Sequence, residues 1–275
     1  MPSAEPALAV RAGGSAAPPR GARTPLPARY RARAHVSVSS LCRLLRGVVV
    51  VVLGVLALAT GCGGAGADDG STSQLWITRD RGSEVLYEGT VPAGLTVMQA
   101  LERVADVETR YGGRFVQAIE GVEGSASRGR DWFFFVNGVA ADRSAAEYRL
   151  RQGEIAWWDY RRWAGSPETR IVVGAFPEPF LHGYDGERPR VVVTYDRPSQ
   201  RAAAAGVARL LGGRVVDGRV PCCPSTFHLA AREPCFEAET VSAEGPYRFV
   251  FAGDAQALVR DPSRFRFRFE GASCD

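Results

Sequence analysis

The sequence predicts an α+β protein with two folded units in series, residues 74–163 and 170–275. Short runs of β-branched and aromatic residues, bounded by Gly, Pro, Asp and Asn, recur in both segments and indicate strands. Helical periodicity occurs in both as well, at residues 96–105 and at residues 199–211. Because strands and helices are mixed within each segment, and each has the length of an ordinary domain, we expect two α+β domains.

Residues 1–35 are rich in Ala, Arg, Pro and Gly and lack apolar periodicity. Such a segment buries too little apolar surface to offset the loss of chain entropy, and we expect it to be disordered. The alternative is that it is not translated. A start codon at Val36 or Val38 would give the next segment the ordinary length of a signal peptide.

Residues 36–61 have the features of a secretory signal. Arg43 and Arg46 precede an apolar run at residues 48–59, which is too short to span a membrane as a helix, and small residues follow it. The sequence therefore predicts export from the cytoplasm.

The end of this signal, LATGC at residues 58–62, resembles the lipobox of bacterial lipoproteins, in which the cysteine becomes the acylated first residue. Lipoboxes prefer Leu at the position that Ala59 occupies. The resemblance implies lipidation of Cys62 and an extracytoplasmic protein anchored to the cell membrane. A freely secreted form and an uncleaved anchor are the alternatives. Residues 62–73, rich in Gly, Ala and Asp, are predicted to be a flexible tether.

The charge balance changes once the leader is removed. Residues 1–61 contain eight of the 34 basic residues and one of the 30 acidic residues, so residues 62–275 carry 26 basic and 29 acidic side chains. The resulting net charge of −3 contrasts with +4 for the whole chain. Nucleic-acid binding needs a basic surface on the folded part, and we therefore expect no nucleic-acid partner.

The first unit is predicted to have the element order β-β-α-β-β-β. Thr96 is positioned to cap the helix with Gln99 as its capping-box partner, and apolar residues then repeat at helical spacing from Val97 to Val104. Asn137-Gly138, which tolerate positive φ, predict a tight turn after the fourth strand. The predicted strands are residues 75–78, 85–91, 115–119, 132–136 and 155–160.

The last two of these strands belong to a stretch, residues 131–163, that holds four of the five tryptophans. Side chains alternate across a strand, so large apolar groups lie on both faces of the sheet. The helix covers one aromatic face and leaves the opposite one open. We expect the second unit to cover that open face, with a partner or a ligand as the alternatives. The candidate ligand or partner residues are Trp132, Phe134, Trp157, Trp158 and Tyr160.

Several motifs in this unit resemble, in order and spacing, a bacterial β-grasp domain of unknown function that is related to the transcobalamin C-terminal domain and to the SLBB group. They are VMQAL at residues 97–101, IEGV at 119–122, the W…VNG pattern at 132–138, and YRLRQGE at 148–154 followed by IAWWDY. The resemblance covers residues 74–163 and implies the β-grasp fold. In the transcobalamins the related domain closes over one face of cobalamin, which implies a corrinoid as the first ligand to expect here.

The second unit reads as β-α-β-β-α-β, the ferredoxin-like order. Its predicted helices are residues 199–211, ended by Gly212-Gly213, and residues 254–260, stopped by Pro262. A long cysteine-rich loop is expected in the middle of the unit. The predicted strands are residues 171–176, 190–195, 214–216, 247–251 and 265–270.

Four of the six cysteines, Cys222, Cys223, Cys235 and Cys274, lie in this second unit. An even number of cysteines in an exported protein predicts disulfides. Adjacent cysteines seldom bridge each other, which leaves two pairings: 222 with 235 and 223 with 274, or 222 with 274 and 223 with 235. A metal site using His228 with Cys222 or Cys223 and Cys235 is the alternative, which an oxidising compartment disfavours.

No catalytic constellation is present in the sequence. It contains no nucleophile elbow, phosphate loop or HExxH motif, and residues 62–275 include only two histidines. Cys223 and His228, five residues apart in a disulfide-prone loop, make a weak nucleophile pair. We therefore expect a binding protein and not an enzyme, with no cofactor or metal.

The leading hypothesis is a membrane-tethered extracytoplasmic binding or accessory protein. Its β-grasp unit would bind cobalamin or a similar ligand through the aromatic strands and pass it to a transporter. The alternative is a cell-envelope interaction module without a small ligand, in which the exposed aromatic residues contact another protein or a polysaccharide. Fold alone does not decide between them.

Overall fold

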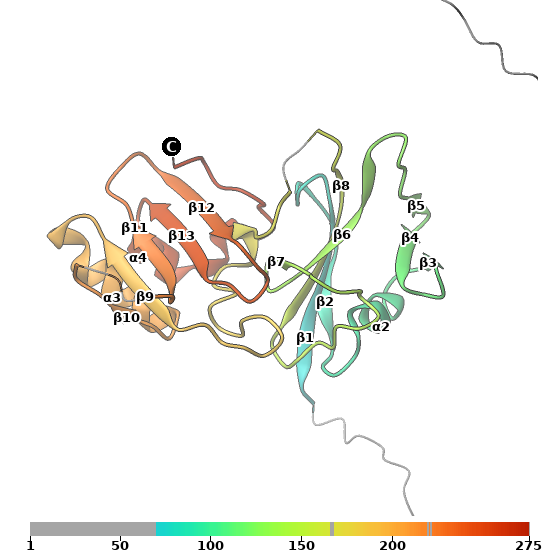
Figure 1. Cartoon of the computed structure of the whole chain (residues 1–275), viewed down its shortest axis with the longest axis horizontal. Helices are drawn as coiled ribbons and strands as arrows, with labels where there is room; N and C mark the ends of the chain where they lie inside the picture. The colour runs from blue at the N-terminus through green and yellow to red at the C-terminus, as the bar shows by residue number, and fades with distance from the viewer. Residues whose placement is uncertain (1–69, 166–167, 219, 221, 275) are drawn as a thin grey trace, which may run out of the picture. The chain divides into compact units, whose positions relative to one another are not determined.

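A computed structural model describes residues 70–165, 168–218, 220 and 222–274 (Figure 1). The predictions made for residues 1–61, for lipidation at Cys62 and for most of the tether lie outside the described residues. The described residues belong to one compact unit of mixed α+β structure. Within the described part of the chain, no helix is both long enough and apolar enough to cross a membrane.

The first sheet has the strand order β2-β1-β8-β6-β7. The first and last long strands, β1 and β8, are parallel neighbours in its centre, while β1–β2 and β6–β8 are antiparallel. This mixed sheet with one helix, α2, is the β-grasp arrangement that the sequence predicts. Its elements are β1 (Thr72–Arg79), β2 (Glu84–Pro92), α2 (Val97–Glu102), β6 (Arg130–Val136), β7 (Val139–Ala140) and β8 (Ile155–Arg162).

The start of α2 is fixed by the capping box that the sequence predicts. The Thr96 hydroxyl accepts the N–H of Gln99 at 3.1 Å, and the Gln99 side chain accepts the N–H of Thr96 at 3.0 Å. Two backbone donors at the helix start are therefore satisfied. Val97, Ala100 and Leu101 are buried on the face toward the sheet.

The turn at Asn137-Gly138 is also confirmed. Both residues have positive φ, 51° and 77°, and they connect β6 to β7 as a two-residue hairpin. The Asn137 side chain is buried and does more than form the turn. It accepts the N–H of Ile155 at 2.8 Å and donates to the carbonyl of Gly183 at 2.8 Å, so it joins β8 to the segment that precedes β9.

A small sheet with the order β3-β4-β5 lies beside the first one. Only β4 (Phe115–Ile119) is predicted by the sequence. The strands on either side of it, β3 (Val107–Arg110) and β5 (Val122–Glu123), are short and mostly polar or exposed. Segments of this length carry no readable alternation, because their conformation is set by pairing with β4.

The second sheet has the order β10-β9-β11-β13-β12, in which only β12 runs antiparallel. The two helices α3 and α4 contact each other. Its elements are β9 (Val191–Tyr195), α3 (Arg201–Leu210), β10 (Arg214–Val215), β11 (Ser225–Leu229), β12 (Cys235–Thr240), β13 (Tyr247–Ala252) and α4 (Ala255–Arg260), with 3₁₀ turns at Val173–Ala175 (η2), Pro198–Gln200 (η3) and Pro262–Phe265 (η4).

This sheet corrects the predicted ferredoxin-like order, which is antiparallel. The cysteine-rich stretch read as a loop contains β11 and β12, and adding them makes four neighbouring strands parallel. Two predicted strands are absent from the described residues. Residues 171–176 form a single bridge at Ile171 followed by η2, and residues 265–270 form the end of η4 and turns. In that last segment Phe267 and Phe269 pack on the first sheet and Phe265 packs on the second, and none of them pairs as a strand.

The aromatic face of the first sheet that lies away from α2 is covered by the chain itself. A cluster there combines Trp76, Phe135 and Trp157 with residues of the second half of the chain, Val172, Ala175 and Phe269. The expectation that the second unit covers this face is confirmed. Large rings on both faces of the sheet thus have a structural explanation.

The cysteines are paired, but neither predicted pairing is correct. The bridges are Cys235–Cys274 and Cys222–Cys223. The C-terminal segment returns beside β12, where the N–H of Phe236 donates to Ala272 and the N–H of Gly271 donates to Phe236. This return brings Cys274 next to Cys235, which leaves Cys222 and Cys223 to each other.

Candidate ligand-binding groove

The candidate site is a groove along the free edge of β6. β7 pairs with β6 only at Phe135 and Val136, and Arg130 forms an isolated bridge with Ser125, so among the described residues the stretch 131–134 has β8 on one side and no strand on the other. The groove has a volume of about 730 Å³, within the usual range for ligand pockets. Its lining includes the consecutive residues Asp131, Trp132, Phe133 and Phe134, and therefore side chains from both faces of the sheet.

On the α2 side, Trp132, Phe134 and Trp158 line the groove and take part in tilted aromatic pairs. Phe134 and Trp158 have ring centroids 4.9 Å apart with an angle of 32° between their planes. Trp132 lies 5.2 Å from Tyr160, and β5 accepts a hydrogen bond from each of these two rings. Trp132 Nε1 donates to Val122 at 2.8 Å and Tyr160 donates to Glu123 at 3.0 Å. The small sheet therefore fixes two of the four rings.

On the opposite side of β6, Arg161 of β8 lies over aromatic rings. Its guanidinium carbon is 4.2 Å from the ring centre of Phe133, 5.0 Å from Phe135 and 5.2 Å from Phe269. Burial lowers the pKa of Arg161 to about 10, and the negative charge of Asp159 opposes that shift. The side chain therefore stays positively charged at neutral pH.

Two buried hydrogen-bond donors at the groove have no partner among the described residues. They are Nε1 of Trp158 and Nη1 of Arg161. Buried donors are nearly always hydrogen-bonded, because an unmade bond costs about 1–3 kcal/mol. Both residues line the groove, so each places a donor without a described partner close to it, one on each side of the β6 edge.

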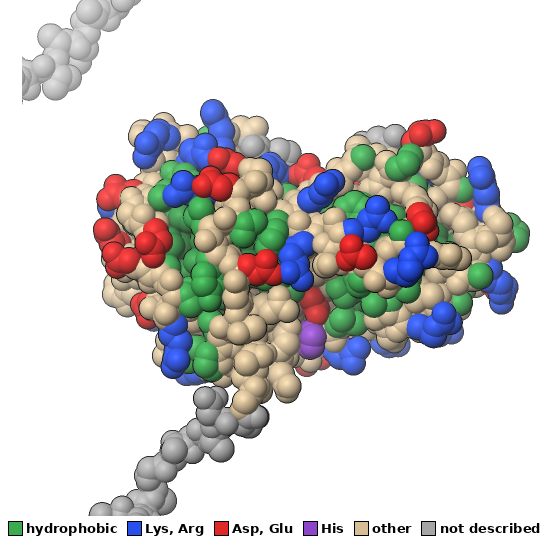
Figure 2. Space-filling view, turned by 180° about the vertical axis from the view of Figure 1, so that it is seen from behind, with side chains coloured by type: hydrophobic (Ala, Val, Ile, Leu, Met, Phe, Trp, Pro, Cys, Tyr) green, Lys and Arg blue, Asp and Glu red, His purple; other side chains and the backbone are tan. Residues whose placement is uncertain are grey.

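Basic side chains predominate in the groove. Burial raises the pKa of Asp131, and the N–H of Trp132 partly opposes this shift. Figure 2 shows acidic and basic side chains mixed over the face that it displays, with apolar side chains between them. The groove lining itself carries more basic than acidic side chains. The basic ones are Arg81, Arg114, Arg161 and Arg162, and the acidic ones are Asp131 and Glu168.

The five aromatic residues that the sequence puts forward have different positions. Trp132, Phe134 and Trp158 line the groove, and Tyr160 supports Trp132 from β8. Trp157 is fully buried on the opposite face, where its Nε1 donates to Thr78 at 2.8 Å, so we correct its assignment to the ligand face. Its neighbours from the second half of the chain leave no access to it.

Sequence reasoning missed the basic side of the groove. Arg161 follows directly after the aromatic strand pattern and lies on the same face as Trp157 by alternation, which could have indicated a buried cation. Arg81 and Arg114 come from distant turns, and only the folded chain brings them to β6.

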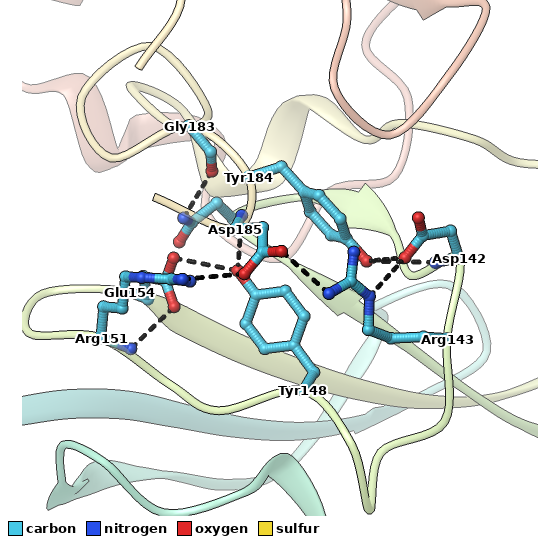
Figure 3. Close-up of polar contacts among 9 residues, drawn as sticks. Asp142, Arg143, Tyr148, Arg151, Glu154, Gly183, Tyr184 and Asp185 are labelled. Carbon is cyan, nitrogen blue, oxygen red and sulfur yellow. Dashed lines mark hydrogen bonds and ion pairs between the residues drawn. The ribbon is translucent and has the colours of Figure 1, made fainter. Parts of the chain in front are cut away.

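A buried polar network lies outside the groove and connects the β7–β8 loop to the segment before β9 (Figure 3). The Tyr148 hydroxyl donates to Glu154 at 3.0 Å and accepts the N–H of Asp185 at 2.9 Å. The other carboxylate oxygen of Glu154 accepts the N–H of Arg151 at 2.8 Å. Glu154 is fully buried, and this burial raises its pKa against those hydrogen bonds.

The outer part of the network consists of ion pairs. Arg143 bridges Asp142 at 3.0 Å and Asp185 at 2.8 Å, Arg151 adds a second contact to Asp185 at 2.8 Å, and Tyr184 donates to Asp142 at 2.6 Å. Hydrogen bonds from Arg151 and Arg143 hold the pKa of Asp185 below its usual value. These groups satisfy one another, so the network holds the connecting segment in place and does not resemble a binding site.

The comparisons with known proteins concern the β-grasp unit. Residues 94–162, which include α2, β6 and β8, match the family described as "Domain of unknown function (DUF4430)". No curated protein matches the chain.

Two solved structures are similar to this part. A candidate metal-binding protein from Ruminococcus gnavus ATCC 29149 is 16% identical with a TM-score of 0.28, over 34% of this chain and 98% of that one. Haptocorrin in complex with Cbi is 19% identical with a TM-score of 0.29, over 34% of this chain and 26% of that one. The match thus spans about a quarter of haptocorrin.

Proposed function

We propose that the protein is an exported, lipid-anchored binding protein whose groove along β6 holds a ligand with a broad apolar face and oxygen acceptors. The main supporting observation is that Trp158 and Arg161 line a groove rich in aromatic rings, and each has a buried donor, Nε1 and Nη1, without a partner among the described residues. Rings contribute apolar contact area, and the donors set orientation and specificity. The role is binding without catalysis.

A corrinoid is the first ligand to test. It is a large macrocycle with two apolar faces and amide carbonyl groups around its rim. Broad aromatic rings such as Phe134 and Trp158 suit the face, and the donors of Trp158 and Arg161 suit the carbonyl groups. The transcobalamin resemblance of the motifs in this unit motivates the same choice. After binding, the ligand would pass to a membrane transporter.

The test is equilibrium dialysis of corrinoid against the purified protein, with corrinoid absorbance as the readout. Trp158→Phe keeps a ring but removes the Nε1 donor, so the affinity should fall about five- to tenfold. Trp76→Phe is the matched control, because its Nε1 is also buried without a partner but does not line the groove. Absence of bound corrinoid at saturating concentration would contradict this choice of ligand.

Localisation forms a separate part of the proposal. Two disulfides in the described residues are typical of proteins that fold outside the cytoplasm, and the signal pattern before Cys62 supports lipidation there. Cys62→Ser should release the protein from the membrane fraction into the medium or a soluble fraction. Unchanged membrane association of this variant would rule out the lipid anchor.

A second candidate is a cell-envelope interaction module, which the free edge of β6 favours. Exposed strand edges accept an extra strand from a partner through backbone hydrogen bonds. In that case a polypeptide segment would lie along residues 131–134, since Arg130 is already bridged to Ser125. Replacing Phe134 with Pro would block such pairing, whereas corrinoid binding in dialysis would favour the first candidate.

A further inference from the structure

Arg161 is an unusual residue to find inside the protein. It is 8% exposed, its guanidinium lies over three aromatic rings, and Nη1 has no hydrogen-bond partner among the described residues. Rings stabilise a cation through their faces but do not replace hydrogen bonds to its N–H groups. A buried charge without an ionic or hydrogen-bonded partner is costly, so its position calls for an explanation.

The nearest acid on the same face of β8 does not supply that partner. Asp159 is fully buried, and both of its carboxylate oxygens are already used. One oxygen accepts the Thr78 hydroxyl at 2.6 Å and the N–H of Gly82 at 3.1 Å, and the other accepts the N–H of Arg81 at 3.2 Å. No ion pair of Arg161 within 4.0 Å occurs in the described part of the chain.

The neighbouring arginines, Arg81 and Arg162, do not neutralise the charge of Arg161, because their own charge has the same sign. Arg81 also lines the groove and adds like charge, and its guanidinium is paired with Glu270 at 2.6 Å. Arg162, the next residue in the chain, donates to the carbonyl of Ala164 at 3.2 Å. Among the described residues Arg161 therefore has no ion-pair partner, and it lies at the wall of a groove that has room for a ligand.

We infer that the ligand of the β6 groove is an amphipathic anion, whose carboxylate, sulfonate or phosphate oxygens bond to Arg161 while its apolar body lies along the rings of the groove. The inference rests on the proposed binding role of the groove and gives its ligand a negative charge at Arg161, in place of the neutral amide carbonyl group that a corrinoid would offer there. Guanidinium groups bind such oxyanions with hydrogen bonds about twice as strong as neutral ones.

The test compares two fluorescent probes that share one aromatic framework. N-phenyl-1-naphthylamine is neutral, and 8-anilinonaphthalene-1-sulfonate carries one negative charge. The protein should bind both, with the anionic probe held at least about tenfold more tightly, as a hydrogen bond to a charged group predicts. Arg161→Gln should remove this preference and keep the affinity for the neutral probe. Arg103→Gln, an exposed arginine outside the groove, should change neither affinity.

The outcomes separate the two proposals. If neither probe binds, the proposed role of the groove fails. If the neutral probe binds and the anionic probe is not preferred, the groove stands and the inference about charge is wrong. An equal preference in the protein and in Arg161→Gln also contradicts it.

A competition with the unaltered protein covers the case in which Arg161→Gln does not fold. Naphthalene-2-carboxylate and naphthyl phosphate are each compared with naphthalene-2-carboxamide as competitors of the neutral probe. Displacement about tenfold better by either anion than by the amide supports the inference, and the better anion identifies the preferred group. Equal displacement by all three compounds overturns it.

Discussion

Trp157 of β8 lies edge-on against Phe269 of the C-terminal segment, with ring centroids 5.1 Å apart and an angle of 81° between the planes. Phe269 also contacts Phe135 at 5.3 Å and lies under the guanidinium of Arg161. This side chain near the C-terminus therefore helps Val172 and Ala175 to cover the face of the first sheet that lies away from α2. It also forms part of the support behind the groove.

Phe269→Ala should lower the free energy of unfolding by about 3–5 kcal/mol, because a buried ring is lost and a cavity remains. Urea unfolding followed by tryptophan fluorescence measures this change. Phe115→Ala is the control, since Phe115 is 41% exposed and should cost far less. Equal losses for the two variants would mean that Phe269 does not help to cover the face.

Of the two disulfides, Cys235–Cys274 should contribute more to the free energy of unfolding. It joins residues 39 apart in sequence and ties the C-terminal segment to β12. Replacing both cysteines by Ser should cost about 4 kcal/mol, because the unfolded chain regains the entropy of an open loop of this length. The Cys222–Cys223 bridge joins adjacent residues and closes no sizeable loop. Replacing both of these cysteines by Ser should therefore cost much less free energy of unfolding. Urea unfolding without reductant distinguishes the two variants.

Tyr148→Phe should lower the free energy of unfolding by about 1–3 kcal/mol, because the N–H of Asp185 and an oxygen of Glu154 both lose their hydrogen-bond partner in a buried site. Tyr111→Phe is the matched control, since Tyr111 is 80% exposed. Amide hydrogen exchange should show faster exchange near Asp185 in the first variant only. Unchanged exchange there would contradict the role we give the network.

His182 should make stability depend on pH in the neutral range. The hydrogen bond to Glu178 raises the pKa of His182 above its usual 6.5, more than burial lowers it; Glu154 adds to the increase and Arg188 opposes it. Because the folded-state pKa is the higher one, this contribution is full below pH 6.5 and is lost as the pH rises through the folded-state pKa.

Unfolding midpoints in urea between pH 6 and pH 8.5 check this dependence, with His182→Gln expected to show a smaller decline toward high pH. The effect is modest because 40% of the His182 side chain is exposed. A decline of the same size in both proteins would assign the dependence to other groups.

The sequence predicted the local structure correctly where a few neighbouring residues determine it. The capping box of Thr96 and Gln99 and the turn at Asn137-Gly138 depend on φ preferences and nearby hydrogen bonds, and both are present as predicted. The two faces of β6 and β8 follow from alternation alone. The bonds of Asn137 to Ile155 and Gly183 could not be predicted, because they join segments far apart in the chain.

By itself, the sequence determined the class of the fold, the β-grasp order of the first unit, and the presence of two aromatic strands. Only the tertiary structure decided which cysteines pair, which strands of the second sheet are parallel, and which rings border the groove. The physical reason is that these features depend on contacts between distant segments. Trp157 and Trp158 are neighbours in sequence and both are buried, yet Trp157 packs against Phe269 on one face of the sheet, while Trp158 borders the groove on the other.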